Sequence, residues 1–177
     1  MISSIAVSGL PCSGKTTLAS SIAKKLGWGY SNTGENLRQI AKARGIPIEK
    51  FGRLDEGDLR AADAMTLEGM KTRPHYVWEG RLSAWLSKDI PLVLRIFVTA
   101  DFDVRSSRLC SRDKISHHVA GVRLIERQDE ETKVFKSLYG ISDVIQNSNP
   151  DLILDSSNLS VEEMIDSVFK SQGILFG

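Results

Sequence analysis

The feature that most constrains this chain is an eight-residue stretch near its N-terminus, Gly9-Leu10-Pro11-Cys12-Ser13-Gly14-Lys15-Thr16. It fits the pattern G-x-x-x-x-G-K-[ST] and lies between a buried strand predicted over Ile2–Val7 and a helix predicted over Lys15–Leu26. Glycine at both ends of the pattern permits backbone conformations in which successive N–H groups point inward at phosphate oxygens. The sequence therefore predicts a phosphate-binding loop, or P-loop, between a strand and a helix.

The loop and the first helical turn supply the predicted nucleotide site. Lys15 is expected to reach the β- and γ-phosphates of a nucleoside triphosphate, and the Thr16 hydroxyl is expected to bind Mg²⁺. Cys12 has two interpretations, an oxidation-sensitive thiol or a passive small residue, and the second is favoured. We therefore predict ATP and Mg²⁺ as cofactors, Thr16 as the metal ligand, and the cofactor-binding residues Gly9, Pro11, Cys12, Ser13, Gly14, Lys15, Thr16 and Thr17.

Short apolar runs alternate with helical patterns along the rest of the chain. A short strand is expected before Asn32, and further strands are predicted over Tyr76–Trp78, Leu92–Val98 and Leu152–Leu154. Helices are predicted over Glu35–Ala43, Glu49–Gly52, Leu59–Met70, Asp101–Arg112, Ala120–Leu138 and Val161–Phe169. Ser160 and Glu163 have the spacing of a capping box for the last helix. This alternation predicts an α/β fold with a parallel sheet.

Composition and charge narrow the partners that such a chain would have. Its 177 residues are enough for one domain with a sizeable core. A net charge of +1 gives no bias toward a nucleic acid or a membrane surface. Apolar runs such as Pro91–Ala100 are too short to span a membrane, and two cysteines are too few for a disulfide framework. We expect a cytoplasmic, monomeric protein whose partner is a small molecule.

A P-loop alone does not name a reaction, so the other motifs decide the class. The chain has no N-K-x-D motif of the kind that reads guanine in GTPases. Large ATPase motors carry a long apolar strand that ends in Asp-Glu, and the nearest candidate here, Tyr76-Val77-Trp78-Glu79, is short. The sequence therefore favours a compact phosphotransferase.

Two segments have the character of an acceptor pocket. Residues 32–38 follow a short strand and open a helix, whose first-turn N–H groups together with Arg38 suit an anionic group. Glu79-Gly80-Arg81 lies at the carboxyl end of a strand, where open α/β sheets bind ligands. Arg38 is equally consistent with a solvated helix residue, and Glu79 and Arg81 with a structural ion pair.

A third segment is a stripe of arginines. Arg105, Arg108 and Arg112 share one helix face, so their guanidinium groups are expected to converge. Arg127 and Glu131 follow at i, i+4 in the next helix. Without a P-loop, such a stripe is more often a solvated face. Beside a P-loop it suits phosphoryl transfer, because arginine neutralises the charge that gathers on the γ-phosphate.

In this order the motifs resemble those of the short, archaeal-type cytidylate kinases, within the nucleoside monophosphate kinase group of P-loop kinases. The likeness covers most of the chain. It includes the P-loop, Thr33-Gly34 with Arg38, residues 46–52 and 78–85, the arginine stripe, Arg127 with Glu131, Tyr139-Gly140-Ile141, and residues 151–159. The Glu-Gly-Arg-Leu and Tyr-Gly-Ile segments are fairly specific to that family, whereas the P-loop is not.

The resemblance implies one P-loop kinase domain with a five-stranded parallel sheet flanked by helices. Its core would comprise residues 1–32, 71–104 and 145–177. An acceptor-binding insertion would span about 33–70, and an Arg-rich lid about 105–127. The implied reaction is transfer of the ATP γ-phosphoryl group to CMP, dCMP or a modified CMP.

The resemblance also implies residue roles. Arg112 and Arg127 would close over the transferring group and act as catalytic residues with Lys15. Glu131 lies where the family places an acidic residue that holds acceptor hydroxyls. The implied substrate-binding residues are Thr33, Gly34, Arg38, Asp63, Glu79, Gly80, Arg81 and Glu131.

The chain departs from the family pattern on the acceptor side. Val134-Phe135 stands where an Arg-Tyr pair is usual, so one expected phosphate contact is missing. In the segment 61–66, Asp63 stands in for the charged residues expected there, and Ser142 precedes Asp143 where Asp is expected directly. Two alternatives therefore remain: a P-loop kinase for a different small metabolite, and a nucleotide-binding regulator without catalysis.

Overall fold

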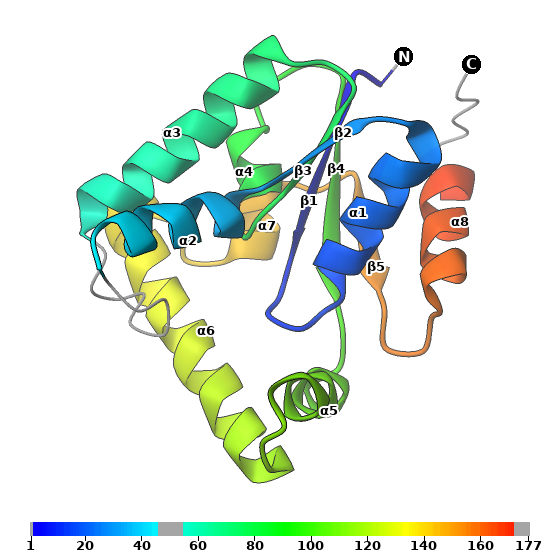
Figure 1. Cartoon of the computed structure of the whole chain (residues 1–177). Coiled ribbons are helices and arrows are strands. Elements are labelled where there is room, and N and C mark those ends of the chain that lie inside the picture. Colours follow the sequence, from blue (N-terminus) through cyan, green and yellow to red (C-terminus); the bar gives the residue numbers. More distant parts are fainter. Residues whose placement is uncertain (1, 46–54, 172–177) are drawn as a thin grey trace.

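A five-stranded sheet is the framework of the molecule. The computed structural model describes residues 2–45 and 55–171. All strands are parallel, in the order β2-β3-β1-β4-β5 (Figure 1). They are β1 (Ser4–Gly9), β2 (Gly29–Asn32), β3 (Tyr76–Glu79), β4 (Val93–Thr99) and β5 (Leu152–Asp155). The predicted α/β fold is therefore confirmed, and the four strands predicted with bounds lie within two residues of them.

The central strand β1 shows how the sequence produces layers. All six of its residues are buried, as expected of a parallel strand covered on both faces. Ile5 and Val7 pack with the buried side chains of α1 (Lys15–Leu26) and α8 (Val161–Ser171). Ala6 points to the other face, where it packs with Trp78 of β3. The alternation of side chains along one strand thus serves two separate apolar clusters.

Four of the described helices cover the second face of the sheet. This face packs against α3 (Glu56–Thr72), α4 (Ser83–Leu86), α6 (His117–Tyr139) and α7 (Val144–Ser148). The two remaining described helices are α2 (Thr33–Ala43), which packs against α3, and α5 (Phe102–Asp113), which packs against α6. Figure 1 shows α6 running from α5 toward α2 and α3, so one long helix joins α5 to the pair formed by α2 and α3. Within the described ranges, no helix is both long and apolar enough to cross a membrane.

The helix after the P-loop begins and ends where it was predicted. Gly14 precedes it at φ 87° and Gly27 follows it at φ 65°, both in the left-handed region that favours glycine. The capping box of α8 is also present, since Glu163 N donates to Ser160 Oγ at 3.3 Å and Ser160 N donates to Glu163 Oε2 at 2.8 Å. Local capping residues therefore fix both helix starts.

Several helix bounds differ from the prediction, and each difference has a local cause. α2 begins two residues early because the Asn32 side chain accepts a hydrogen bond from Glu35 N. α6 begins at His117 because the Ser116 side chain accepts from Val119 N. The short helices α4 and α7 were not predicted, because four and five residues show no helical periodicity. The helix predicted over Glu49–Gly52 lies outside the described residues.

Candidate active site

The P-loop follows β1 at the carboxyl edge of the sheet. Cys12 and Gly14 have left-handed backbones at φ 61° and 87°. Among the described residues, the N–H groups of Gly14, Lys15 and Thr16 have no hydrogen-bond acceptor. Three free N–H groups at the start of a helix form a binding site for an anion such as a phosphate. The predicted phosphate-binding loop thus has the geometry that its function requires.

The other predicted residues of the loop divide between its wall and its mouth. Pro11 and Ser13 are buried, whereas Thr16 and Thr17 are exposed on the first turn of α1. Cys12 packs against the apolar cluster that α5 and α6 share. These placements agree with a passive role for Cys12 and with an accessible Thr16 hydroxyl.

Side chains far away in the sequence brace the loop. Ser156, just after β5, donates from Oγ to Ser13 O at 2.6 Å. Arg108 of α5 donates to Ser156 O at 2.7 Å and to Cys12 O at 3.4 Å. Ser156 is fully buried and was not predicted as a site residue. Ser156 lies in the segment 151–159 that carries the resemblance, but its contact with the loop could not be predicted, because only the fold brings residues 13 and 156 together.

Lys15 faces a buried carboxylate. Its Nζ lies 3.8 Å from Glu79 Oε1, with side-chain exposures of 14% and 3%. Burial lowers the pKa of Lys15, although the charge of Glu79 opposes that shift. The other carboxylate oxygen of Glu79 accepts hydrogen bonds from Tyr30 and Asn32 of β2. Glu79 therefore pairs with Lys15, and the alternative of an ion pair between Glu79 and Arg81 is wrong.

Two arginines meet at one buried carboxylate beside the P-loop. Arg81 donates from Nε to Glu131 Oε2 at 2.6 Å, and Arg127 donates from Nε to Glu131 Oε1 at 2.9 Å. Arg81 also donates to the carbonyl oxygen of Gly9. Burial raises the pKa of Glu131, but the charges of Arg81 and Arg127 outweigh burial and hold that pKa below its ordinary value. The three side chains link the P-loop to α6.

The start of α2 lies against the segment that follows β3. Thr33 Oγ1 lies 3.1 Å from Thr66 Oγ1 of α3, so these hydroxyls are hydrogen bonded. Gly80 fits closely here, since a Cβ atom at this position would lie 2.7 Å from Thr33 Oγ1. Gly34 is in the first turn of α2. Arg38 belongs to the same helix, but its side chain lies outside the described part of the structure.

The arginine stripe of α5 does not converge on one point. Arg105 is buried and donates to Ala100 O at 3.1 Å and to Gln128 Oε1 at 2.8 Å. Arg112 has 61% of its side chain exposed and pairs with its neighbour Asp113. Together with the contacts of Arg108 described above, each guanidinium serves a different part of the molecule. The predicted convergence is wrong, because buried and loop acceptors capture two of the three groups.

The altered part of the acceptor side is built around α3 and the end of α6. Asp63 accepts a hydrogen bond from Tyr139 Oη at 2.7 Å. Burial raises the pKa of Asp63 to about 6, against an opposing effect of this hydrogen bond. Val134 packs among apolar side chains that include Leu59 and Leu138. The wall that would hold the missing arginine is therefore apolar.

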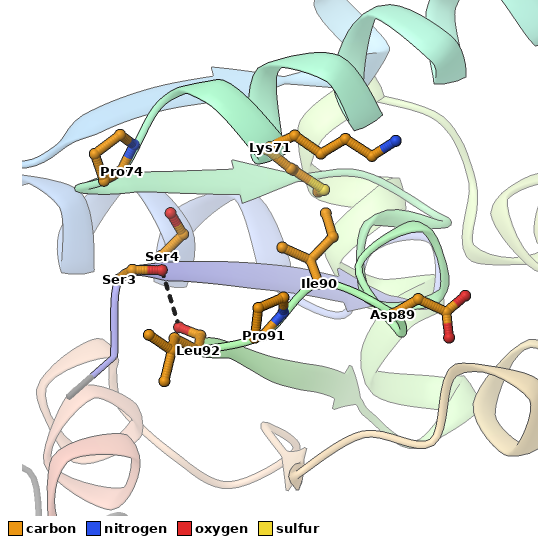
Figure 2. Close-up of a pocket in the computed structure, with 9 residues that line it drawn as sticks. Ser3, Ser4, Lys71, Pro74, Asp89, Ile90, Pro91 and Leu92 are labelled. Atoms are coloured by element: carbon orange, nitrogen blue, oxygen red, sulfur yellow. Dashed lines mark hydrogen bonds between the residues drawn. The ribbon is translucent and has the colours of Figure 1, made fainter.

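A hollow elsewhere on the surface is separate from this site. It is lined by residues at the amino ends of β1 and β4 and at the end of α3, among them Ser3, Lys71, Asp89 and Leu92 (Figure 2). Ser3 Oγ donates to Leu92 O at 3.2 Å there. None of the predicted site residues lines it, and the P-loop lies at the opposite end of the sheet. The hollow has no part in the proposed chemistry.

Relatives of known identity match nearly the whole chain. A family model described as an AAA domain matches residues 5–136. A cytidylate kinase from Sulfolobus acidocaldarius is 32% identical over 167 residues, which cover 93% of this chain and 91% of that protein. A cytidylate kinase from Pyrococcus abyssi is 37% identical over 161 residues, which cover 89% of this chain and 87% of that protein.

Solved structures share the fold at low sequence identity. An uncharacterized protein from Eubacterium ventriosum has a TM-score of 0.72 at 18% identity, covering 96% of this chain and 97% of that one. A shikimate kinase from Bacteroides thetaiotaomicron has a TM-score of 0.66 at 14% identity, covering 98% and 100%. At such identities the likeness concerns the fold alone. With the P-loop geometry and the full-length relatives, the resemblance found in the motifs is confirmed: this chain belongs to the cytidylate kinase family of P-loop kinases.

Proposed function

We propose that this protein transfers the γ-phosphoryl group of ATP to CMP, dCMP or a modified CMP and releases the nucleoside diphosphate. The observation that supports this most directly is the link from the P-loop through Arg81 and Glu131 to Arg127. It stations two guanidinium groups beside the loop that would hold the γ-phosphate. The names of the full-length relatives support CMP as the acceptor.

The P-loop residues fit ATP with Mg²⁺. The free N–H groups of the loop suit the phosphates, and Lys15 lies beside them. The Thr16 hydroxyl is exposed and has no hydrogen bond among the described residues, so it is available to hold the metal ion. The described chain contains no cluster of three His, Cys, Asp or Glu side chains that could hold a metal. Mg²⁺ takes most of its ligands from phosphates and water, and it supplies charge neutralisation when bound.

The acceptor is proposed to lie between α2, α3 and α6. Thr33, Gly34 and Arg38 would hold its phosphate and sugar, and Glu79, Gly80 and Arg81 would form the floor at the end of β3. Glu131 would hold an acceptor hydroxyl in addition to its two arginines, and Asp63 would contribute its oxygen Oδ1. An acceptor phosphate is already an anion, so no general base is required.

Closure of the lid is the proposed source of rate and fidelity. Arg127, half exposed on α6, and Arg112, exposed on α5, would approach the transferring group when the α5–α6 lid closes. Closure would exclude water, which strengthens each electrostatic contact and suppresses hydrolysis of ATP. Arginine suits this role because it stays charged at every relevant pH.

The test is a panel of acceptors in an ATP-consumption assay. CMP, dCMP, UMP, a 5-substituted CMP, AMP, GMP and phosphate-free nucleosides are compared, and the mass of each product is measured. We expect the highest kcat/KM with CMP or a close relative and a product of nucleoside diphosphate mass. Turnover with none of the nucleotides, while ATP still binds, would contradict the proposed acceptor.

One observation favours a second candidate, a kinase for a different small metabolite. Val134 is part of an apolar wall where a phosphate contact is expected, so the pocket has lost a cation. Turnover only with a phosphate-free acceptor in the same panel would support this candidate.

We further propose a cytoplasmic monomer, in keeping with a net charge of +1 and two free cysteines.

A further inference from the structure

The buried carboxylate of Glu79 is held from the side by strand β2. In the parallel pairing of β2 with β3, Tyr30 lies opposite Val77 and Asn32 opposite Glu79. Tyr30 and Asn32 are two residues apart, so both side chains lie on the same face of the sheet. Tyr30 Oη donates to Glu79 Oε2 at 3.1 Å, and Asn32 Nδ2 donates to the same oxygen.

The two oxygens of Glu79 therefore have different tasks. Oε2 is held by β2, and Oε1 faces Lys15 Nζ at 3.8 Å. Rotation of the buried Glu79 carboxylate away from β2 would break both of these hydrogen bonds, so the two donors restrain its orientation. Tyr30 and Asn32 thus hold the Glu79 carboxylate in the orientation that faces Lys15.

Tyr30 is suited to remain a hydrogen-bond donor over the whole physiological pH range. Burial and the negative charge of Glu79 raise the pKa of Tyr30 to about 12, although the hydrogen bond from Asn32 opposes this shift. Asn32 Nδ2 also donates to Tyr30 Oη at 3.2 Å, so the three side chains form a closed set. The hydroxyl therefore keeps its proton and keeps donating to Glu79.

Asn32 connects this set of three side chains to α2, which is part of the proposed acceptor-binding insertion. Its Nδ2 holds Glu79, while its Oδ1 accepts from Glu35 N and caps α2. One amide thus fixes the start of the helix that bears Thr33 and Gly34 relative to the carboxylate that faces Lys15. Asn32 therefore lies between the proposed donor side, at Lys15, and the proposed acceptor side, at the start of α2.

We propose that Tyr30 and Asn32 are positioning residues that act through Glu79, holding its free oxygen toward Lys15 and the phosphates. The inference rests on the proposed phosphoryl transfer. It assigns to β2 the role of holding the Glu79 carboxylate, which neither the P-loop nor the lid contacts from that side. When ATP draws Lys15 onto its phosphates, the clamped carboxylate stays in place and keeps the ammonium group extended across the mouth of the loop.

The first experiment removes single donors from the clamp. Tyr30→Phe deletes only the hydroxyl. Asn32→Asp keeps an oxygen to cap α2 but sets a second carboxylate against Glu79. We expect kcat to fall about 10-fold in Tyr30→Phe and about 100-fold in Asn32→Asp, the range for residues that orient a reactive group. The KM for ATP is expected to stay within about twofold, because uniform binding is retained.

Tyr76→Phe is the matched control. Tyr76 begins β3 at the far end of the same strand pair, opposite Gly29, and its hydroxyl has no hydrogen bond among the described residues. It should leave kcat unchanged. In a Glu79→Gln background, Tyr30→Phe should cause no further loss of kcat, since its effect passes through Glu79. An additive loss would contradict positioning through that carboxylate.

A second measurement does not depend on the reaction. The pKa of Lys15 in the nucleotide-free protein can be followed by NMR of its Cε, and the nearby charge of Glu79 raises that pKa. We expect Tyr30→Phe and Asn32→Asp to change it and Tyr76→Phe to leave it unchanged. An unchanged Lys15 pKa in both variants, with kcat within twofold of wild type, would overturn the inference. Failure of the wild type to phosphorylate CMP would instead count against the proposed function, and the Lys15 measurement would still decide the role of β2.

Discussion

The donor and acceptor sides of the site are built in different ways. The proposed donor side is one continuous segment, residues 9–17, in which free backbone N–H groups would bind the phosphates. Arg108 and Ser156 hold carbonyl oxygens of the loop and leave the N–H groups of Gly14, Lys15 and Thr16 without an acceptor among the described residues. A backbone site of this kind tolerates many side chains, provided that glycine and the strand–helix context are kept.

The proposed acceptor side would be assembled from side chains of β2, α2, α3, β3 and α6. Its three carboxylates are each engaged by another side chain, as Glu79 is by Tyr30, Glu131 by Arg81, and Asp63 by Tyr139. A single substitution in such a network leaves a partner behind and changes the shape or charge of the pocket. The predictions below test this contrast between a backbone site and a network of side chains.

The largest effect is expected on the donor side, at Lys15. Lys15→Met removes the only P-loop side chain with a charge that can reach the transferring phosphoryl group. We expect kcat to fall about 1,000-fold, the upper range for loss of one preorganised charge-stabilising group. Lys24→Met, exposed on the same helix, is the control and should be close to wild type. Substantial turnover by Lys15→Met would show that the donor side was assigned wrongly.

On the acceptor side, Glu131→Gln should cost stability as well as activity. The change leaves the buried Arg81 guanidinium without a negative partner, so we expect a loss of about 3 kcal/mol in the free energy of unfolding. The pKa of Glu131 is lowered in the folded protein, so its contribution is complete above the unfolded pKa and disappears as the pH falls through the folded one. Urea denaturation at pH 7 and below pH 4 measures both effects. Glu130→Gln, at an exposed neighbouring position, is the control. Equal losses of unfolding free energy in the two variants would show that the Arg81–Glu131 ion pair does not stabilise the fold.

The fold could be predicted where the chain marks its own boundaries. Gly14 and Gly27 set α1 to the residue, and the capping box set the start of α8. The predicted start of α6 is three residues late, because His117 and His118 do not extend the apolar spacing of the helix, even though Ser116 caps them. Capping by side chains thus carried more information than hydrophobic spacing at helix starts.

The sequence allowed the residues of the candidate site to be named, but it predicted less well which of them contact one another. Glu131 and Arg127 are four apart on one helix, so their contact follows from helical geometry. The pairing of Glu79 with Lys15 and of Arg81 with Glu131 depends on the strand order, which the sequence does not display. Tyr30 and Asn32 were missed for the same reason, although their spacing of two at the end of a strand is a usable signal once β2 is known to lie beside β3.

The apolar wall at Val134 allows the acceptor side to be restored. Val134→Arg returns a cation to the position where the family pattern has one. If the CMP phosphate approaches this wall, a charge-assisted hydrogen bond should lower the KM for CMP about 10-fold. Val122→Arg, on the exposed face of α6, adds the same charge elsewhere and should leave KM unchanged. Equal KM values in both variants would mean that the acceptor phosphate lies away from Val134.

The smallest expected effect concerns Asp63, which separates structural from acceptor contacts on the altered side. The folded pKa of Asp63 is about 6 against an ordinary value of 3.8, so the folded protein binds more protons than the unfolded chain between these values, and its stability falls as the pH rises through them. Asp63→Asn keeps an acceptor for Tyr139 and removes the buried charge. The variant should therefore gain stability relative to wild type at pH 7, and the gain should be about 1 kcal/mol smaller at pH 5.

The same variant tests the proposed contact of Asp63 Oδ1 with the acceptor. An amide oxygen is a weaker acceptor than a carboxylate by about 1 kcal/mol, so the KM for CMP should rise about fivefold if that contact exists. Glu68→Gln, exposed on the same helix, is the control for charge. A pH-dependent change in stability with an unchanged KM would give Asp63 a purely structural task, which is to hold α3 against α6. In that case recognition of the base would have to come from β2, β3 and α2, and the acceptor side would divide into a binding half and a supporting half.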